Sequence, residues 1–566
     1  MFSLWVNGEF LQLKHQSLSV VLSSPIFMGQ ETMNHSLPFE VPNTPVNQKI
    51  LSYPASYFYY KLPEDNRFDF RLYYSGALLF TGILKVIGTS FSSLELVLIL
   101  SNTSLLNQVR EKYLSEIDLG GNRDMGAWYV TLLETIEKSF PQVDFNAFPV
   151  EDEKFFDGTE FQTYYREHFN CVNFYTTAYG FYHLNSPIVP FPYLGYVYCQ
   201  IFKSHGFEFI DNVFLKDTDL SRLVIFNTHC INSSFDNSQL LLDPPSVFNL
   251  CNNVPHIKVS DFLNEMANLG IIFFIDPQTS KVTTRTIDQV FKDSTCLDFN
   301  LMIASESISL EFETKKGFAF SFSGDGSDEY TSSKVQDISS FHYRGTVQSY
   351  EDLPMDDNQV NDCYFCYEDN TFYVWSFREN FNENRWWNCG SGLSPHYQGN
   401  REFAIDAANG SLAMEWGSTS PDRIATWMVP KTEQAGNCRS YPDFQSNTFS
   451  LRLLLYHGMK KDNWMDDYPF GSSSNFDYYG NQCGNLSISW HGQWGFYEKY
   501  WKEFLFWYLG GVRIFKFKAY GHIGDIKSLD LSRKYRYNNL IFFIKTVKIN
   551  FDESSQVSFE FETLLL

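Results

Sequence analysis

The pattern of apolar and polar positions changes its period within residues 495–551. Over 495–509, in GFYEKYWKEFLFWYLGG, aromatic residues recur every three or four positions, which predicts a helix with a wide apolar face. After the helix-ending pair Gly510-Gly511, apolar residues alternate with lysines over 513–519, as in a half-buried strand. Asn538-Asn539 separates two further β-forming runs and predicts a hairpin. The unit is therefore an amphipathic helix on an antiparallel sheet.

The period of two also dominates the start of the chain. Asn7-Gly8 lies between two short alternating runs and is a strong hairpin signal. Thr44 followed by Pro45 predicts the start of a short helix. Six or so short strands predict a small barrel or sandwich over residues 1–103.

Between these β regions the signal is mixed. Residues 104–300 combine helical patterns, the clearest at 190–206, with short strands, and are expected to form an α/β insert domain. Residues 301–380 together with 448–566 are expected to form a second β domain, with the helix 495–509 packed on it. Residues 381–447 are rich in Gly, Ser, Asn and Pro and are expected to be a loop-rich insertion. The predicted fold class is α+β and β-rich.

Composition supports several folded domains. The chain has 566 residues, of which 44% are hydrophobic and 18% aromatic, enough for sizeable cores and many strands. The formal net charge of −23 argues against a protein that grips nucleic acid across its whole surface. Ten irregularly spaced cysteines do not form a disulfide framework, so synthesis in a reducing cytoplasm is expected. No secretion signal and no membrane anchor are predicted.

Two short motifs could bind a metal, but a simpler interpretation is favoured for each. Cys363 and Cys366 form a CxxC pair without the second ligand pair that a zinc site needs, so a hairpin is favoured. The acidic run 324–329 lacks the spaced carboxylates and final Glu of a calcium loop, so a solvated hairpin tip is favoured. No metal site and no cofactor are predicted.

A hydrolase would need paired carboxylates across a cleft or an activated nucleophile. Glu415 and the pair Asp466-Asp467, all near aromatic residues, are the best candidates for a glycosidase. Such groupings arise often by chance in a chain with 66 acidic residues. Motifs for a nucleophile elbow, a zinc protease or a phosphate loop are missing from the sequence. Enzymatic activity is not expected, and no catalytic residue is predicted.

Charge is distributed unevenly along the chain. Residues 513–548 contain nine bases and two acids, a net +7, whereas 345–377 contain seven acids and no base. One interpretation is a pair of solvated hairpin faces. The other is a contact between basic and acidic surfaces of neighbouring subunits. The residues predicted for that contact are Arg513, Lys516, Lys518, Lys545, Lys548, Asp356, Asp357 and Asp362.

Seven segments, spread over about residues 35–551, occur in an order that resembles the tail-hub, or baseplate-hub, proteins of long-tailed bacteriophages. They are SLPFEVPNTPVNQKIL, GALLFTGILKV, PFPYLGYVYCQIFKSHGFEF, VSDFLNEMANLGIIFFIDPQTSKVTTRTI, LRLLLYHG, GFYEKYWKEFLFWYL and YNNLIFFIKTVKIN. The resemblance implies two small tube-type β-barrel domains flanking an α/β insert. It also implies a homotrimer whose six barrels form a ring that closes the tail tube distally and connects it to the tip or fibres.

The partners implied by the resemblance follow from this ring. Its lumen would pass tape-measure protein and then DNA without specific binding, and its faces would contact tail-tube, distal tail and tail-tip or fibre proteins. The long loops at 381–447 and 459–484 would contact other baseplate proteins. The protein would be made in the host cytoplasm and reside in the virion tail. A glycan-binding surface β protein, with exposed Trp and Tyr as sugar platforms, is the alternative, and a glycoside hydrolase is a third.

Overall fold

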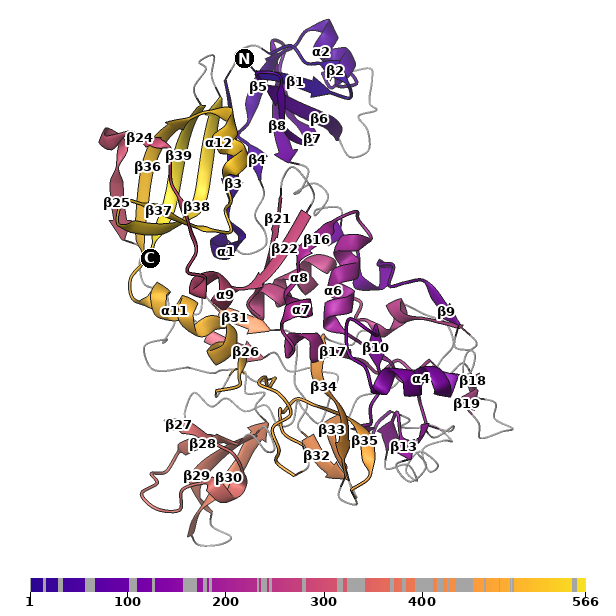
Figure 1. The fold of residues 1–566 in the computed structure, drawn as a ribbon. Coiled ribbons are helices and arrows are strands. Elements are labelled where there is room, and N and C mark those ends of the chain that lie inside the picture. The colour runs from indigo at the N-terminus through magenta and orange to yellow at the C-terminus, as the bar shows by residue number, and fades with distance from the viewer. Residues whose placement is uncertain are drawn as a thin grey trace.

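The fold is known from a computed structural model (Figure 1). The described residues are 2–13, 17–28, 34–55, 67–100, 109–124, 128–155, 170–176, 181–182, 186–231, 234–235, 242–243, 247–276, 281–312, 319–322, 342–366, 371–378, 383–391, 411–414, 421–424, 427–432, 451–462, 465–477, 479–488, 490, 493–551 and 557–566. Within them the predicted α+β, β-rich class is confirmed.

A 15-stranded sheet joins the two ends of the chain (Figure 1). Its first half comprises β1 (Phe2–Val6), β2 (Glu9–Phe10), β3 (Leu18–Ser23), β4 (His35–Ser36), β5 (Phe39–Pro42), β6 (Phe68–Tyr74), β7 (Ala77–Thr89) and β8 (Ser93–Leu100), with helices α1 (Pro25–Met28) and α2 (Pro45–Ile50). The predicted turn at Asn7-Gly8 is confirmed, since both residues have positive φ and Val6 pairs with Glu9. Thr44 Oγ1 caps α2 by accepting a hydrogen bond from Asn47 N.

The second half of the sheet comes mainly from the end of the chain. It comprises β23 (Cys296–Asp298), β24 (Met302–Ile303), β25 (Ser309–Phe312), β36 (Arg513–Gly521), β37 (Lys534–Tyr537), β38 (Leu540–Phe551) and β39 (Val557–Leu565), with helix α12 (Ile523–Ser528). The predicted hairpin at Asn538-Asn539 joins β37 to β38.

The two halves meet where β3 pairs with β38. The antiparallel register runs from Leu18 opposite Phe551 to Ser23 opposite Thr546. Both halves contribute to one apolar core, in which the rings of Tyr74 and Phe551 lie 5.5 Å apart. The sheet is therefore continuous across a join between segments more than 500 residues apart.

A central α/β unit lies below this sheet in Figure 1. Its helices are α4 (Trp128–Ile136), α6 (Leu194–Lys203), α7 (Val213–Lys216), α8 (Val259–Asn268) and α9 (Ile287–Lys292). Its strands are β9 (Asn122–Asp124), β10 (Phe145–Asn146), β11 (Val150–Asp152), β12 (Cys171–Val172), β13 (Tyr175–Thr176), β14 (Phe181–Tyr182), β15 (Phe191–Pro192), β16 (Glu208–Asp211), β17 (Leu223–Phe226), β18 (Ser234–Phe235), β19 (Leu242–Asp243), β20 (Val247–Asn249), β21 (Ile271–Ile275) and β22 (Lys281–Thr286). Most of these strands are very short and pair few backbone groups with one another. Side chains must therefore form hydrogen bonds with many of the remaining backbone N–H and C=O groups.

Two strands from residues 448–566, which were expected to belong to the second β domain, lie in this central unit instead. Strand β34 (Arg452–Lys461) pairs with β17 on one side and with β35 (Asp467–Ser472) on the other. Residues 453–455 are fully or almost fully buried in the central core, which explains their place there. Part of the predicted long loop 459–484 is therefore strand.

The middle of the chain forms a further four-stranded sheet at the opposite end of the molecule from the large sheet (Figure 1). Its strands are β27 (His342–Val347), β28 (Asp362–Cys366), β29 (Thr371–Arg378) and β30 (Glu383–Ser391). It has its own small core around Leu353, Cys366, Tyr373 and Trp386. Residues 342–378 were expected in the second β domain and residues 383–391 in the loop-rich insertion, but their apolar side chains pack against one another in this separate sheet.

Four short strands complete the described part of the chain. Strand β26 (Ala319–Phe322) pairs in parallel with β31 (Ser411–Met414). Strand β32 (Pro421–Ile424) pairs with β33 (Trp427–Thr432), which extends the sheet of β11 and β12.

The predicted helix 495–509 is confirmed in position, but its packing differs from the prediction. It begins with a π-helical turn, Tyr497–Trp501, and continues as α11 (Lys502–Leu509). Trp501 Nε1 donates to Asn268 O at 3.0 Å in the central unit, and Trp507 Nε1 donates to Leu565 O at 3.0 Å in the large sheet. The helix therefore lies in the joint between the two units.

A small apolar cluster completes this joint. It contains Ile26, Ile272, Val290 and Phe543, which come from α1, β21, α9 and β38. The ring of Phe291 packs against Phe543 at 5.1 Å and against Trp507 at 5.0 Å. Side chains from three separate regions thus fix the large sheet on the central unit.

Two further observations concern cysteines and membranes. Among the cysteines that the structure describes, seven form no disulfide, whereas Cys230 is disulfide-bonded. Among the helices of the described ranges, none has the length and apolar content needed to cross a bilayer.

Candidate functional site

The predicted basic residues lie on the outer face of the large sheet. Strand β36 contributes Lys516 and Lys518 to this face, and β38 contributes Lys545 and Lys548. Strand β39 lies between them, because it pairs with both neighbours. The apolar residues that alternate with these lysines face the core, so the predicted period of two is confirmed here.

Two glutamates of β39 bind these lysines across the strands. Glu560 contacts Lys548 Nζ at 3.3 Å and Lys518 Nζ at 3.8 Å. Glu562 binds Lys545 Nζ at 2.8 Å. We call these six side chains the charge ladder: Lys516, Lys518, Lys545, Lys548, Glu560 and Glu562.

Acids from outside residues 513–548 bind three bases of that run, namely Lys516, Arg533 and Arg536. Glu311 of β25 binds Lys516 Nζ at 2.8 Å, and Asp298 of β23 binds Arg536 at 2.8 Å. Arg533 contacts Asp293 at 3.3 Å. The net +7 counted along the sequence therefore does not persist as a basic surface, because strand pairing brings in acids from distant segments.

The remaining predicted interface residues lie apart from the ladder. Arg513 is exposed at the start of β36, and among the described contacts it has no ion-pair partner. Asp356 and Asp357 are exposed in the segment before β28. Asp362 is buried and accepts a hydrogen bond from Arg344 Nε at 2.8 Å, so it stabilises its own sheet. The acidic and basic residues occupy opposite ends of one chain (Figure 1).

The other motifs lie in structural settings. Cys363 and Cys366 are buried free thiols on β28, which forms the predicted hairpin with β29. Asp466 and Asp467 are exposed, and Asp467 binds Lys461 at 2.8 Å. Residues 324–329 and Glu415 lie outside the described residues. Within the described ranges, no group of three or more His, Cys, Asp or Glu residues could hold a metal ion.

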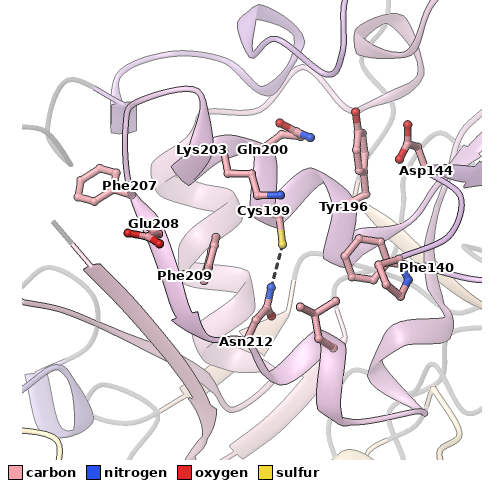
Figure 2. A pocket seen from close by; sticks show the side chains of 12 residues that line it. Phe140, Asp144, Tyr196, Cys199, Gln200, Lys203, Phe207, Glu208, Phe209 and Asn212 are labelled. Carbon is pink, nitrogen blue, oxygen red and sulfur yellow. Dashed lines mark hydrogen bonds between the residues drawn. The ribbon is translucent and has the colours of Figure 1, made fainter.

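A pocket of about 610 Å³ lies beside α6, and no sequence motif indicated it (Figure 2). Its walls come from α6, the following turn and β16, α7, and the segment 140–144. The side chains that line it include Phe140, Tyr196, Cys199, Lys203, Phe207 and Phe209. Tyr196, Gln200 and Lys203 recur at helical spacing on α6, the one pattern in the sequence that could have indicated this wall.

Polar groups in the pocket are held by hydrogen bonds and an ion pair. Burial raises the pKa of the Cys199 thiol to about 11, and its sulfur accepts a hydrogen bond from Asn212 Nδ2 at 2.9 Å. The thiol is therefore protonated at neutral pH and is a poor nucleophile. Arg123 holds Asp144 at 2.7 Å and donates to Tyr196 OH at 3.0 Å.

Lys203 is the exposed cation at this pocket. Its ammonium group makes no hydrogen bond or ion pair within the described part of the chain. In Figure 2 its side chain extends from α6 above Cys199, on the same side of the pocket as Tyr196. The pocket therefore combines an aromatic wall with the exposed ammonium group of Lys203 and, on β16, the exposed carboxylate of Glu208.

The sequence matches no protein-family model and no curated protein. Two solved structures are similar to the chain. The 43 kDa tail protein of prophage MuSo2 from Shewanella oneidensis has a TM-score of 0.33 and 8% identity, and the match covers 100% of this chain and 97% of that one. The tail protein from Neisseria meningitidis MC58 has a TM-score of 0.31 and 8% identity, covering 100% of this chain and 96% of that one.

Proposed function

We propose that the chain is a structural component of a bacteriophage tail, and within the tail the hub ring that closes the tail tube. The observation that carries the proposal is the pairing of β3 with β38, which joins β units from two distant parts of the chain into one sheet with one core. Two β units of this kind, flanking an α/β unit, are what the ordered sequence segments imply for a hub. Three copies would place six such units around one lumen.

The charge ladder suits a surface that polyanions pass. A basic face would bind DNA tightly, because its cations would release the counterions of the DNA phosphates. A face on which lysines are paired with glutamates has less net positive charge and would bind DNA weakly. Tape-measure protein and DNA would then move through the lumen without specific binding. Catalysis has no part in this role.

Measuring the mass of the purified protein by native mass spectrometry, and by light scattering after size exclusion, tests the proposal. We expect a trimer, and electron microscopy of it should show a ring that binds purified tail tubes. A stable monomer that binds oligosaccharides would contradict the hub and support the glycan-binding alternative.

The predicted contact between basic and acidic surfaces is now proposed for Arg513 with Asp356 and Asp357 of a neighbouring copy. The lysines of the ladder already have acidic partners, whereas Arg513 has none among the described residues. Arg513→Glu should weaken the trimer at low salt, with Lys527→Glu on the neighbouring helix α12 as the control. Unchanged assembly of Arg513→Glu at low salt would contradict this contact.

A further inference from the structure

One apolar side chain is fully exposed to solvent at the tip of the β7–β8 hairpin. Phe91 has a relative exposure of 102%, so no residue in the described ranges covers its ring. Val46 on α2 and Ile87 on β7 are also about half exposed. Large aromatic side chains of this kind are the usual anchors of protein interfaces.

The backbone that carries Phe91 is held in place by several hydrogen bonds. Ser93 N donates to Ser90 Oγ at 2.9 Å, and Ser90 N donates to Ser93 O at 2.8 Å. Asn43 Nδ2 donates to Ser90 O at 3.0 Å and to Phe91 O at 3.3 Å, while Asn43 N donates to Ser92 O at 3.0 Å. A tip that is already ordered loses little entropy when it docks, which favours binding.

The surface next to the tip is acidic. Glu95 of β8 lies directly opposite Glu40 of β5, and like charges in such a pair destabilise a sheet. Glu95 has no ion-pair partner in the part of the chain that the structure describes. A partner that receives Phe91 and brings a basic side chain would provide an ion pair for Glu95.

The pocket beside α6 has the complementary properties. Its volume of about 610 Å³ can receive an aromatic ring, and Phe140, Tyr196 and Phe209 supply apolar wall. Lys203 is exposed there without an ion-pair partner. The aromatic wall is complementary to the exposed ring of Phe91, and the ammonium group of Lys203 is complementary to the carboxylate of Glu95.

We propose that Phe91 of one copy enters the α6 pocket of a second copy, with Glu95 of the first facing Lys203 of the second. The two surfaces are different patches of the same chain, so the contact is head-to-tail and closes into a ring when the rotation allows. This inference rests on the self-association expected from the proposed function, but not on membership of a phage tail.

Truncation of the tip is the first test. Phe91→Ala should raise the dissociation constant of self-association, measured by sedimentation, by about tenfold or more. Phe506→Ala is the matched control, because Phe506 on α11 is also strongly exposed and should leave assembly unchanged. If the wild type assembles and Phe91→Ala assembles equally well, this contact is wrong while the hub proposal stands.

A charge swap tests the orientation of the contact. Glu95→Lys and Lys203→Glu should each weaken association several-fold, and the double variant should recover most of the loss. If the losses of affinity simply add in the double variant, Glu95 and Lys203 do not face each other and this part of the proposal is wrong.

Photo-cross-linking from position 91 would identify the residues that contact the tip. Phe91→p-benzoylphenylalanine, irradiated in the assembled protein, should cross-link to residues 140–144 or 196–215 of another copy. Cross-links that map elsewhere overturn the proposal. A wild type that remains monomeric at all concentrations overturns both this contact and the expected homotrimer.

Discussion

The large sheet and the central α/β unit are stabilised in different ways. In the sheet, long strands satisfy one another's backbone groups, and alternate side chains divide cleanly between the core and the charge ladder. In the central unit many strands have two or three residues, and buried asparagines bind the remaining backbone groups. Single polar side chains should therefore matter much more in the central unit than in the ladder.

Asn173 shows how the central unit depends on such side chains. It is fully buried, its Nδ2 donates to Phe148 O at 3.1 Å and Val189 O at 2.9 Å, and its Oδ1 accepts from Val189 N at 2.8 Å. Asn253 similarly joins Asn227 Oδ1 and His229 O. The bonds to Phe148, Val189 and His229 satisfy backbone groups that a longer strand would have paired through its own backbone.

The largest effect is expected for Asn173→Ala. Three buried backbone groups would lose their partners, and alanine is also strained at a φ of 56°, so the free energy of unfolding should fall by about 3 to 5 kcal/mol. Urea denaturation would measure it. Asn550→Ala, on the ladder face of β38, is the matched control and should lose less than about 1 kcal/mol. Equal losses of stability in the two variants would contradict the view that the central unit depends more on single polar side chains than the large sheet does.

The next largest effect concerns close packing. A Cβ on Gly471 of β35 would overlap the buried ring of Phe148, so Gly471→Ala should destabilise by about 1 to 3 kcal/mol. Gly524 in α12 has open space around it, and Gly524→Ala should stabilise by about 0.5 kcal/mol. Thermal melts of both variants would show opposite shifts. A stabilised Gly471→Ala would mean that the central core is looser than its contacts indicate.

An intermediate effect depends on pH. Burial, aided by the charge of Arg222, lowers the pKa of His457 to about 3, and its Nε2 lies 2.9 Å from Ser474 O. The native state therefore stays unprotonated below the ordinary pKa of 6.5, where the unfolded chain takes up a proton. The contribution of His457 to the free energy of unfolding is therefore fully present above pH 6.5. It falls by about 1.4 kcal/mol per pH unit as the pH decreases from 6.5 towards 3. His457→Gln should remove this one-proton slope from the free energy of unfolding.

The smallest effect is expected in the ladder. Lys518→Ala and Lys548→Ala should each cost less than about 0.5 kcal/mol, because both pairs are partly exposed, and the loss should vanish in high salt. Lys527→Ala, an exposed lysine without an ion pair among the described residues, provides the baseline. A loss above 2 kcal/mol for either ladder lysine, an order-of-magnitude threshold from buried pairs, would show that the face is buried by something else.

Local features of the fold could be predicted because their causes are local. Asn7-Gly8, Thr44-Pro45 and Asn538-Asn539 specify turns or caps through their own backbone preferences, and each is found in place. The segment containing β34 was expected in a β domain, but the sequence could not show that the partner of β34 is β17, more than 200 residues earlier. Strand β35 was missed because Pro469 and Gly471 signal a turn, whereas here they lie in a strand whose partner has an irregular register.

The candidate sites depend on long-range pairing even more strongly. The bases of residues 513–548 were visible as a run, but their acidic partners Glu311 and Glu562 come from other segments. The α6 pocket unites residues 140–144 with 196–215, and no local spacing connects them. The exposed ring of Phe91 could not be distinguished by sequence from a core phenylalanine.

The pairing of β3 with β38 also has a consequence during synthesis. Strand β3 leaves the ribosome early, while Asn550, which binds Ser19, is made 531 residues later. At about 5 to 20 residues per second, the edge of β3 is open for roughly half a minute to two minutes. An unpaired edge of this kind invites wrong pairing with another nascent chain. The N-terminal half-sheet is therefore exposed to this wrong pairing until β38 has been made.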